Sequence, residues 1–397
     1  MATENLLLEA GVVFAVLAVG GGIASRLGQS VIPAYIIFGI LIGPFAPEVA
    51  GQSLTLVETR EFIDLLAELG IVFLLFFIGL EFSFDRLLQA GRKLGEAGSV
   101  DFLVNFGIGV VAGFVFGFDP VETFFLAGIV YASSSAIITK TLVDLGWIAD
   151  PESEPILGVL VFEDIVLAVY LAILTALAFG DGGMNEIASS LARSGAFLVV
   201  LVALAARGEP LVERLLDVQS SEIFLLRVVA AIVFVGGLAL AFGVSEAVAA
   251  FFIGAAFGTT SHAHRIERII SSERDIYAAV FFFSIGLGTD PRLLVTVLVP
   301  VLVLVVLTTG SKLLSGYVTG RRYNLTARRS LRVSLAMIAR GEFSLVVAAL
   351  AAAAGGSAIL GETIPAIGVG YVLVMSILGT VAMRYSRTVE RWFGVAV

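Results

Sequence analysis

The chain of 397 residues has no cysteine, only two histidines and few charged residues. Without cysteine it can form neither disulfides nor thiolate metal sites. Charged residues make up 14% of the sequence, whereas roughly a quarter is typical of soluble domains. Because 58% of the residues are hydrophobic and the mean hydropathy is +1.03, the sequence predicts an all-α polytopic membrane protein.

Lysine is also scarce. The 24 basic residues include only three lysines, Lys93, Lys140 and Lys312, and the net charge is -9. A chain that has almost replaced lysine by arginine, yet keeps Lys312 well inside an apolar segment, is expected to use that amine. The alternative is that Lys312 reaches the cytoplasmic interface with its long side chain.

Apolar runs separated by charged or glycine- and proline-containing breaks predict about thirteen transmembrane segments. They lie near residues 6–26, 30–49, 62–82, 97–117, 121–144, 154–179, 188–206, 220–242, 245–260, 274–289, 293–318, 328–353 and 362–385. We expect one membrane transport domain over residues 1–397, with no cytoplasmic regulatory domain in this chain. The first residues contain no basic stretch, so we expect a retained first span and no cleaved signal peptide.

A short motif occurs twice, as Phe76–Glu81 and as Phe283–Gly288, and Arg-Leu-Leu follows each copy. The offset is about half of the chain, which predicts two inverted six-helix repeats, the plan of secondary transporters. Repeat one is expected near 6–179, a linking helix near 188–206 and repeat two near 220–385. A chance match between apolar segments is the alternative.

Arginine and lysine concentrate in alternate loops. With an external N-terminus, the outward-facing segments contain only Arg60, Arg193 and Arg292, and the remaining basic loop residues face inward. Because basic residues favour the cytoplasmic side, this pattern predicts an N-terminus outside and a C-terminus in the cytoplasm.

Two adjacent carboxyls, Glu163 and Asp164, lie within an apolar segment long enough to cross a bilayer. Ionisable groups at membrane depth are costly and usually belong to paths for ions or protons. Neighbouring residues of a helix point about 100° apart. We therefore expect one carboxyl to bind the transported ion and the other to contact a neighbouring helix through Lys312. A carboxyl pair neutralised by protonation or by a buried partner is the structural alternative.

Polar residues also interrupt two other apolar segments. Ser133, Ser134, Ser135 and Thr139 lie in the fifth segment and predict a local break that can help to bind a cation. Hydroxyls bonded to the carbonyls of their own helix are the alternative. In the twelfth segment, Arg340 and Glu342 flank Gly341, which permits a second break. These two charges could take part in transport or form a structural ion pair.

The motifs Gln29–Pro44, Ala67–Glu81, Ser133–Ser135, Phe162–Ile165 and Arg340–Phe343 together resemble the Kef-type branch of the monovalent cation:proton antiporters. The resemblance implies thirteen helices in two inverted repeats, with broken helices crossing at the midplane, and a homodimer with elevator-like alternating access.

By the same resemblance, Asp164 binds cation and proton in competition, and Lys312 pairs with the acidic dyad when no cation is bound. Relatives have Asp, Asn or Gln at the position of Glu163, so a glutamate leaves both electrogenic and electroneutral exchange open.

The function expected from this resemblance is exchange of K+, or less favourably Na+, for H+ across the plasma membrane of a prokaryote. A gated K+ channel, or a membrane subunit that needs a soluble nucleotide-binding regulatory partner, are the alternatives. No nucleophile, metal-ligand spacing or cofactor motif is visible, so we expect no enzyme, no resident metal or cofactor, and no nucleic-acid partner.

Overall fold

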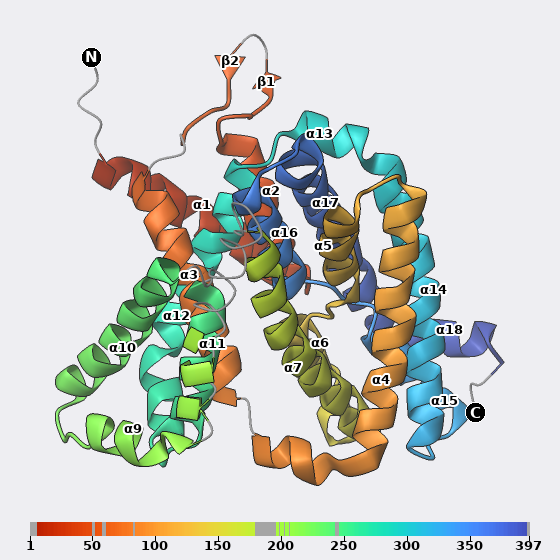
Figure 1. Ribbon diagram of the computed structural model, residues 1–397. Coiled ribbons are helices and arrows are strands. Elements are labelled where there is room, and N and C mark those ends of the chain that lie inside the picture. Colours follow the sequence, from red (N-terminus) through yellow and green to blue (C-terminus); the bar gives the residue numbers. More distant parts are fainter. Residues whose placement is uncertain are drawn as a thin grey trace. The chain divides into compact units, whose positions relative to one another are not determined.

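The computed structural model describes residues 6–49, 52–57, 61–81, 84–178, 196–197, 199–201, 203–205, 207–242 and 246–394. These residues are almost entirely helical (Figure 1). The exceptions to the helical pattern include a small antiparallel hairpin of β1 (Glu48–Val49) and β2 (Gln52–Ser53). The chain divides into two compact units, described separately below.

Unit 1 comprises residues 1–58, 89–167 and 285–397. Its helices are α1 (Leu6–Arg26), α2 (Val31–Ile42), most of α4 (Phe84–Val115), α5 (Pro120–Tyr131), α6 (Ser135–Asp144), the first part of α7 (Ser153–Ala178), α13 (Pro291–Thr296), α14 (Leu298–Arg322), α15 (Ala327–Ala336), α16 (Glu342–Ala354), α17 (Ile364–Arg384) and α18 (Ser386–Trp392). Every residue of the candidate site belongs to this unit.

Unit 2 comprises residues 59–88 and 168–284. Its helices include α3 (Glu61–Glu81), α9 (Glu209–Leu216), α10 (Ser221–Ala241), α11 (Glu246–Gly258) and most of α12 (Ala263–Leu287). The predicted linking helix at 188–206 lies largely outside the described residues.

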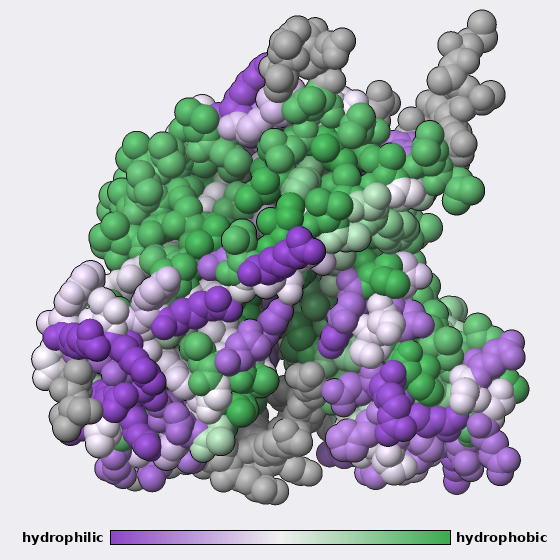
Figure 2. All heavy atoms as spheres, turned by 180° about the vertical axis from the view of Figure 1, so that it is seen from behind, coloured by the Kyte–Doolittle hydropathy of each residue, from purple (hydrophilic) through white to green (hydrophobic). Residues whose placement is uncertain are grey.

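The expected polytopic all-α class is confirmed. Within the described residues, eight helical segments are long and apolar enough to cross a membrane, and α2, α16 and most of α11 are shorter apolar helices. Apart from the predicted segment at 188–206, each predicted span overlaps a helix or a pair of consecutive helices. Figure 2 shows hydrophobic residues gathered over the upper part of the face in view, as expected for side chains that meet lipid.

Several helices begin or end at other residues than the predicted spans. Helix α2 ends at Ile42 rather than near residue 49, because the chain turns into the β1–β2 hairpin. Helices α4 and α12 begin at Phe84 and Ala263, more than ten residues before the predicted spans. Hydropathy detects only the apolar part of a helix, so these polar extensions were missed.

Glycine allows close helix crossings in each unit. In unit 2, a side chain at Gly79 of α3 would collide with the carbonyl oxygen of Phe251 in α11. In unit 1, a side chain at Gly286 of α12 would collide with the carbonyl oxygen of Ile36 in α2. Gly79 and Gly286 occupy equivalent places in the repeated motif, so both copies pack a glycine against the backbone of a short apolar helix.

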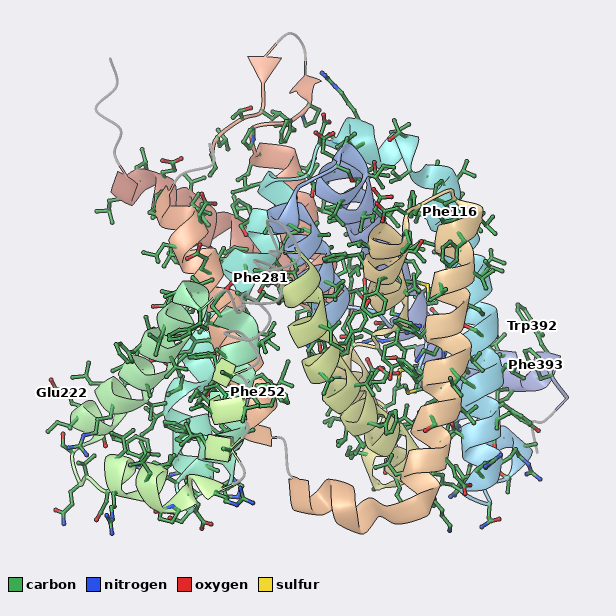
Figure 3. The ribbon with its side chains drawn as sticks, viewed as in Figure 1. Phe116, Glu222, Phe252, Phe281, Trp392 and Phe393 are labelled. Carbon is green, nitrogen blue, oxygen red and sulfur yellow. The ribbon has the colours of Figure 1, made fainter. Side chains whose placement is uncertain are left out.

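Helix α14 separates a lipid-facing side from a polar interior. Val299, Val306 and Leu314 are exposed along it, whereas Lys312 and Ser315 are fully buried. Trp392 and Phe393, at the end of α18, are also exposed (Figure 3). Exposed aromatic residues of this kind are typical of the membrane interface.

Candidate ion-binding site

Two interrupted helices meet in unit 1. Helix α5 ends at Tyr131 and α6 begins at Ser135, while α15 ends at Ala336 and α16 begins at Glu342. The backbone N–H of Ser134 donates a hydrogen bond to the carbonyl of Ala339 at 3.0 Å. The two breaks are therefore in direct contact, and both expose backbone groups that regular helices would satisfy internally.

Glu342 is the first residue of α16, and its carboxylate lies at the N-terminal end of α6. Its carboxylate accepts hydrogen bonds from the Ser134 hydroxyl at 2.5 Å and from the backbone N–H of Ala136 at 3.1 Å. Ser134 also caps α6 by accepting from the N–H of Ile137. A carboxylate at a helix N-terminus is stabilised by the unpaired N–H groups and the helix dipole, so Glu342 neutralises this end of the break.

Arg340 binds the opposite helix ends. Its Nε donates to the carbonyl of Val130, at the end of α5, at 3.2 Å, and its Nη1 donates to the carbonyl of Met337, just after α15, at 2.9 Å. Both interactions put positive charge at helix C-termini, where it is favourable. The sequence left open whether the charges flanking Gly341 pair with each other, and the structure shows that they turn to separate helix ends.

Glu163 faces the break between α5 and α6. It is 1% exposed and accepts hydrogen bonds from the backbone N–H of Ser133 at 2.8 Å and from the Ser133 hydroxyl at 3.0 Å. The ammonium of Lys312 lies 2.7 Å from its Oε1 atom. Glu163 is thus the dyad member that contacts Lys312.

Asp164 points elsewhere, as expected for the next residue of a helix. It is half-buried, and its Oδ1 accepts a hydrogen bond from the Ser135 hydroxyl at 3.3 Å, which is long for a bond between two oxygens. Thr139 is half-buried and lies one turn after Ser135 on α6. Asp164 is therefore the more accessible carboxyl of the dyad.

Lys312 is completely buried and has a second acidic partner that we did not identify from the sequence. Its ammonium lies 2.7 Å from Asp101 of α4, and Asp101 also accepts hydrogen bonds from Asn105 at 2.9 Å and Ser315 at 2.8 Å. Asp101 and Asn105 are four residues apart and share a helix face. A polar pair with this spacing inside a predicted span was the feature that could have revealed them.

The ionisable groups of the site do not balance. Two cationic side chains, Lys312 and Arg340, lie among four carboxyls, those of Asp101, Glu163, Asp164 and Glu342. With every carboxyl ionised, the site would have two excess negative charges. Such an excess in a low-dielectric interior favours binding of a cation or of protons.

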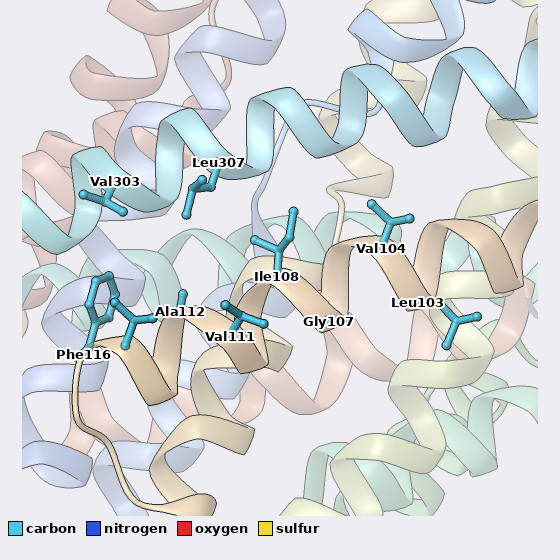
Figure 4. A pocket seen from close by; sticks show the side chains of 10 residues that line it. Leu103, Val104, Gly107, Ile108, Val111, Ala112, Phe116, Val303 and Leu307 are labelled. Atoms are coloured by element: carbon cyan, nitrogen blue, oxygen red, sulfur yellow. The ribbon is translucent and has the colours of Figure 1, made fainter.

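An apolar groove lies between α4 and α14 (Figure 4). Its volume is about 380 Å³, and it is lined by Leu103, Val104, Gly107, Ile108, Val111, Ala112, Val115, Phe116, Val303 and Leu307. No lining residue has a charged or polar side chain, so the groove offers no ligand to a desolvated cation.

A bundle of membrane helices in which two broken helices meet beside buried carboxyls is the architecture of a secondary transporter. The model of the transmembrane sodium/hydrogen exchanger family matches residues 12–384, and the chain belongs to this family. Its members are transporters rather than enzymes, and the membership inferred from the sequence motifs is confirmed.

Among curated proteins, the chain is 38% identical to the K(+)/H(+) antiporter subunit KhtU of Bacillus subtilis, over 98% of this chain and 95% of the relative. It is 28% identical to the ammonium/H(+) antiporter subunit AmhT of Alkalihalophilus pseudofirmus, with the same two coverages. The solved structure of the sodium proton antiporter MjNhaP1 from Methanocaldococcus jannaschii has a similar fold, with a TM-score of 0.68 at 18% identity, covering 96% of this chain and 97% of the other.

Proposed function

We propose that the protein is an antiporter that exchanges a monovalent cation for H+ across a membrane. The observation that carries this proposal is the excess of buried carboxyls beside the contact between the two broken helices. Membership of the sodium/hydrogen exchanger family supports it.

Asp164 is the proposed site of exchange. The cation and the proton compete for its single negative charge, so binding of one releases the other. Its partial exposure and its contact with the hydroxyl of Ser135 support this role. Ser133 and Ser134 act beside it by fixing Glu163 and Glu342, and Thr139 extends the row of hydroxyls on α6.

Glu163 and Lys312 set the charge around Asp164. When no cation is bound, the Lys312 ammonium compensates Glu163, and an arriving cation competes with this contact. The 2.7 Å distance between their charged atoms supports the pairing. Arg340 and Glu342 compensate the partial charges of the helix ends at the two breaks. Their proposed role is therefore to stabilise the broken helices around the site.

We favour K+ as the transported cation. The 38% identical relative is named a K(+)/H(+) antiporter subunit, whereas more distant relatives are named for ammonium and for Na(+). Selectivity depends on the number and spacing of oxygen ligands around the desolvated ion, so it must be measured directly.

The working protein is proposed to be a homodimer in a prokaryotic plasma membrane, with its N-terminus outside and its C-terminus in the cytoplasm. An elevator-like movement would present the site to each side in turn. The division into two compact units, with all site residues in unit 1, supports such a movement. Since two relatives are named antiporter subunits, a separate soluble regulatory subunit is part of the proposal.

The experiment is cation-driven proton exchange in reconstituted liposomes with an internal pH dye. K+, Na+, Li+ or choline is added outside acid-loaded vesicles that contain the wild type, Asp164→Asn or the matched control Asp64→Asn. Asp64 is an exposed residue of α3, so its substitution removes one carboxyl without touching the site. We expect K+ to alkalinise the interior with the wild type and the control, and no response with Asp164→Asn.

Other results point to different functions. Cation flux that persists in Asp164→Asn would indicate a channel. A wild type that moves no ion until a soluble partner is added would indicate an obligate membrane subunit.

A further inference from the structure

Asp101 contacts the Lys312 ammonium, is held in place by residues of α4 and α14, and also lies within side-chain hydrogen-bond reach of Glu163. One oxygen of Asp101 contacts the ammonium at 2.7 Å, and the other accepts from Asn105 and Ser315. The side-chain amide oxygen Oδ1 of Asn105 in turn accepts from the Ser311 hydroxyl at 2.6 Å. Ser311 and Ser315 flank Lys312 on α14, whereas Asp101 and Asn105 share a face of α4.

Glu163 reaches the same ammonium from α7. It also accepts two hydrogen bonds from Ser133 at the break before α6, and its neighbour in sequence is Asp164. The Lys312 ammonium thus bridges a carboxyl held by α4 and α14 and a carboxyl that belongs to the exchange site. All three side chains are at most 2% exposed.

Removing the single partner of a buried charge is strongly unfavourable, because the remaining charge is neither solvated nor paired. If Glu163 were the only partner of Lys312, each arriving cation would have to displace an ammonium that then had no compensation. With Asp101 in place, Glu163 can leave while Lys312 keeps a short contact with a carboxylate.

We propose that Asp101 is a positioning residue for ion exchange: it retains the Lys312 ammonium, so that Glu163 can release it when a cation binds. The inference rests on the proposed antiport at Asp164. In this step the contact between Glu163 and Lys312 breaks, the contact between Asp101 and Lys312 remains, and no proton moves.

The test compares the cation KM and the maximal exchange rate in reconstituted liposomes for the wild type, Asp101→Asn, Asp101→Asn/Lys312→Met and the control Asp64→Asn. In Asp101→Asn, the ammonium has only Glu163 and competes more strongly with the cation, so we expect the KM to rise roughly tenfold. In the double variant the competing ammonium is absent, and the KM should return to within about twofold of the wild-type value.

A role for Asp101 in folding alone would lower the amount of active protein and leave the KM unchanged. An unchanged KM in Asp101→Asn, or a double variant whose KM stays as high as that of Asp101→Asn, would therefore overturn the proposal. Where Asp101→Asn does not reach the liposomes, Ser315→Ala decides, because it removes one hydrogen bond to Asp101 and keeps both charges. We expect its KM to rise about two- to threefold, and no rise would overturn the proposal.

The same assay separates this inference from the proposed function. Exchange that survives in Asp164→Asn would refute antiport at Asp164 itself. Exchange that is lost in Asp164→Asn, together with an unchanged KM in Asp101→Asn, would refute only the role of Asp101.

Discussion

Unit 1 contains two charged clusters that have similar contact distances and different compositions. In the lysine cluster, Lys312 lies 2.7 Å from both Asp101 and Glu163. In the arginine network, Arg332 lies 2.8 Å from both Glu152 and Glu390. The arginine network also includes Arg328, Arg329 and Asp150.

The two clusters differ in charge balance. The arginine network has three cationic and three acidic side chains, so every charge is compensated without a ligand. The lysine cluster has one ammonium for two carboxyls, and Asp164 follows directly in sequence. A balanced network gains nothing from a bound cation, whereas a cluster with excess negative charge does. Similar ion pairs can therefore connect helices in one place and bind a substrate in another.

The basic residue differs as well. Arginine stays protonated and binds carboxylates through a rigid planar fork, which suits a permanent connection between α15, α18 and the segment before α7. Lysine has a compact ammonium on a flexible chain, which is easier to displace. The sequence contains only three lysines, and one of them, Lys312, lies at the candidate site, whereas the arginine network uses arginine alone.

Lys312→Met should have the largest effect on this comparison. It leaves Asp101 and Glu163 buried together without a cation, and removal of one partner of a buried pair costs about 3–5 kcal/mol. We expect a large fall in the melting temperature of the purified protein in detergent, recorded by tryptophan fluorescence. A melting temperature equal to that of the wild type would show that Lys312 does not compensate the two carboxyls.

Arg332→Met should have a smaller effect, because its side chain is 13% exposed and Arg328 and Arg329 still contact the same acids. We expect a loss of about 1–3 kcal/mol in stability and an unchanged cation KM. Thermal unfolding and liposome exchange on the same preparation measure both quantities. A raised KM with unchanged stability would contradict the assignment of this network to structure.

Gly79→Ala tests the helix packing of unit 2, which contains neither charged cluster. The added methyl group meets the carbonyl oxygen of Phe251, so helices α3 and α11 must move apart, at a cost of about 1–3 kcal/mol. We expect a lower melting temperature, with Gly237→Ala in the open surface of α10 as the matched control. Equal melting temperatures for the two variants would show that this crossing is not tight.

The smallest effect is expected at Glu213, a partly exposed acid of unit 2 outside the membrane spans. The backbone N–H of Ser261, 2.7 Å away, and the Ser261 hydroxyl lower the pKa of this carboxyl. A lowered pKa in the folded state means that the contact persists above the ordinary glutamate range and is lost as pH falls through the lowered value. Hydrogen exchange of the Ser261 amide should show this loss, and Glu213→Gln should remove the pH dependence, because a carboxamide does not titrate. Protection of the wild-type amide that is independent of pH would contradict the assignment.

The sequence was sufficient to predict the fold class, most helices and the two breaks. An apolar segment in a membrane must be helical to satisfy its backbone hydrogen bonds, and the polar residues Ser133–Ser135 and Arg340–Glu342 mark where two such helices are interrupted. It also led us to expect that one carboxyl of the dyad turns to Lys312. It did not reveal Asp101, because the contact joins residues 211 positions apart and depends on how α4 and α14 are rotated. In addition, hydropathy averaged over a segment does not detect a single acid. The arginine network was missed because it also joins residues that are far apart in the sequence.

Competition between cation and proton for Asp164 is the central claim, and the cation KM measured against pH tests it most directly. With cation-driven exchange in liposomes, competition predicts that the KM rises in proportion to the proton concentration, about tenfold per pH unit, while the maximal rate stays constant. A KM independent of pH, with a maximal rate that falls as pH falls, would mean that cation and proton bind at separate sites, and would contradict the account.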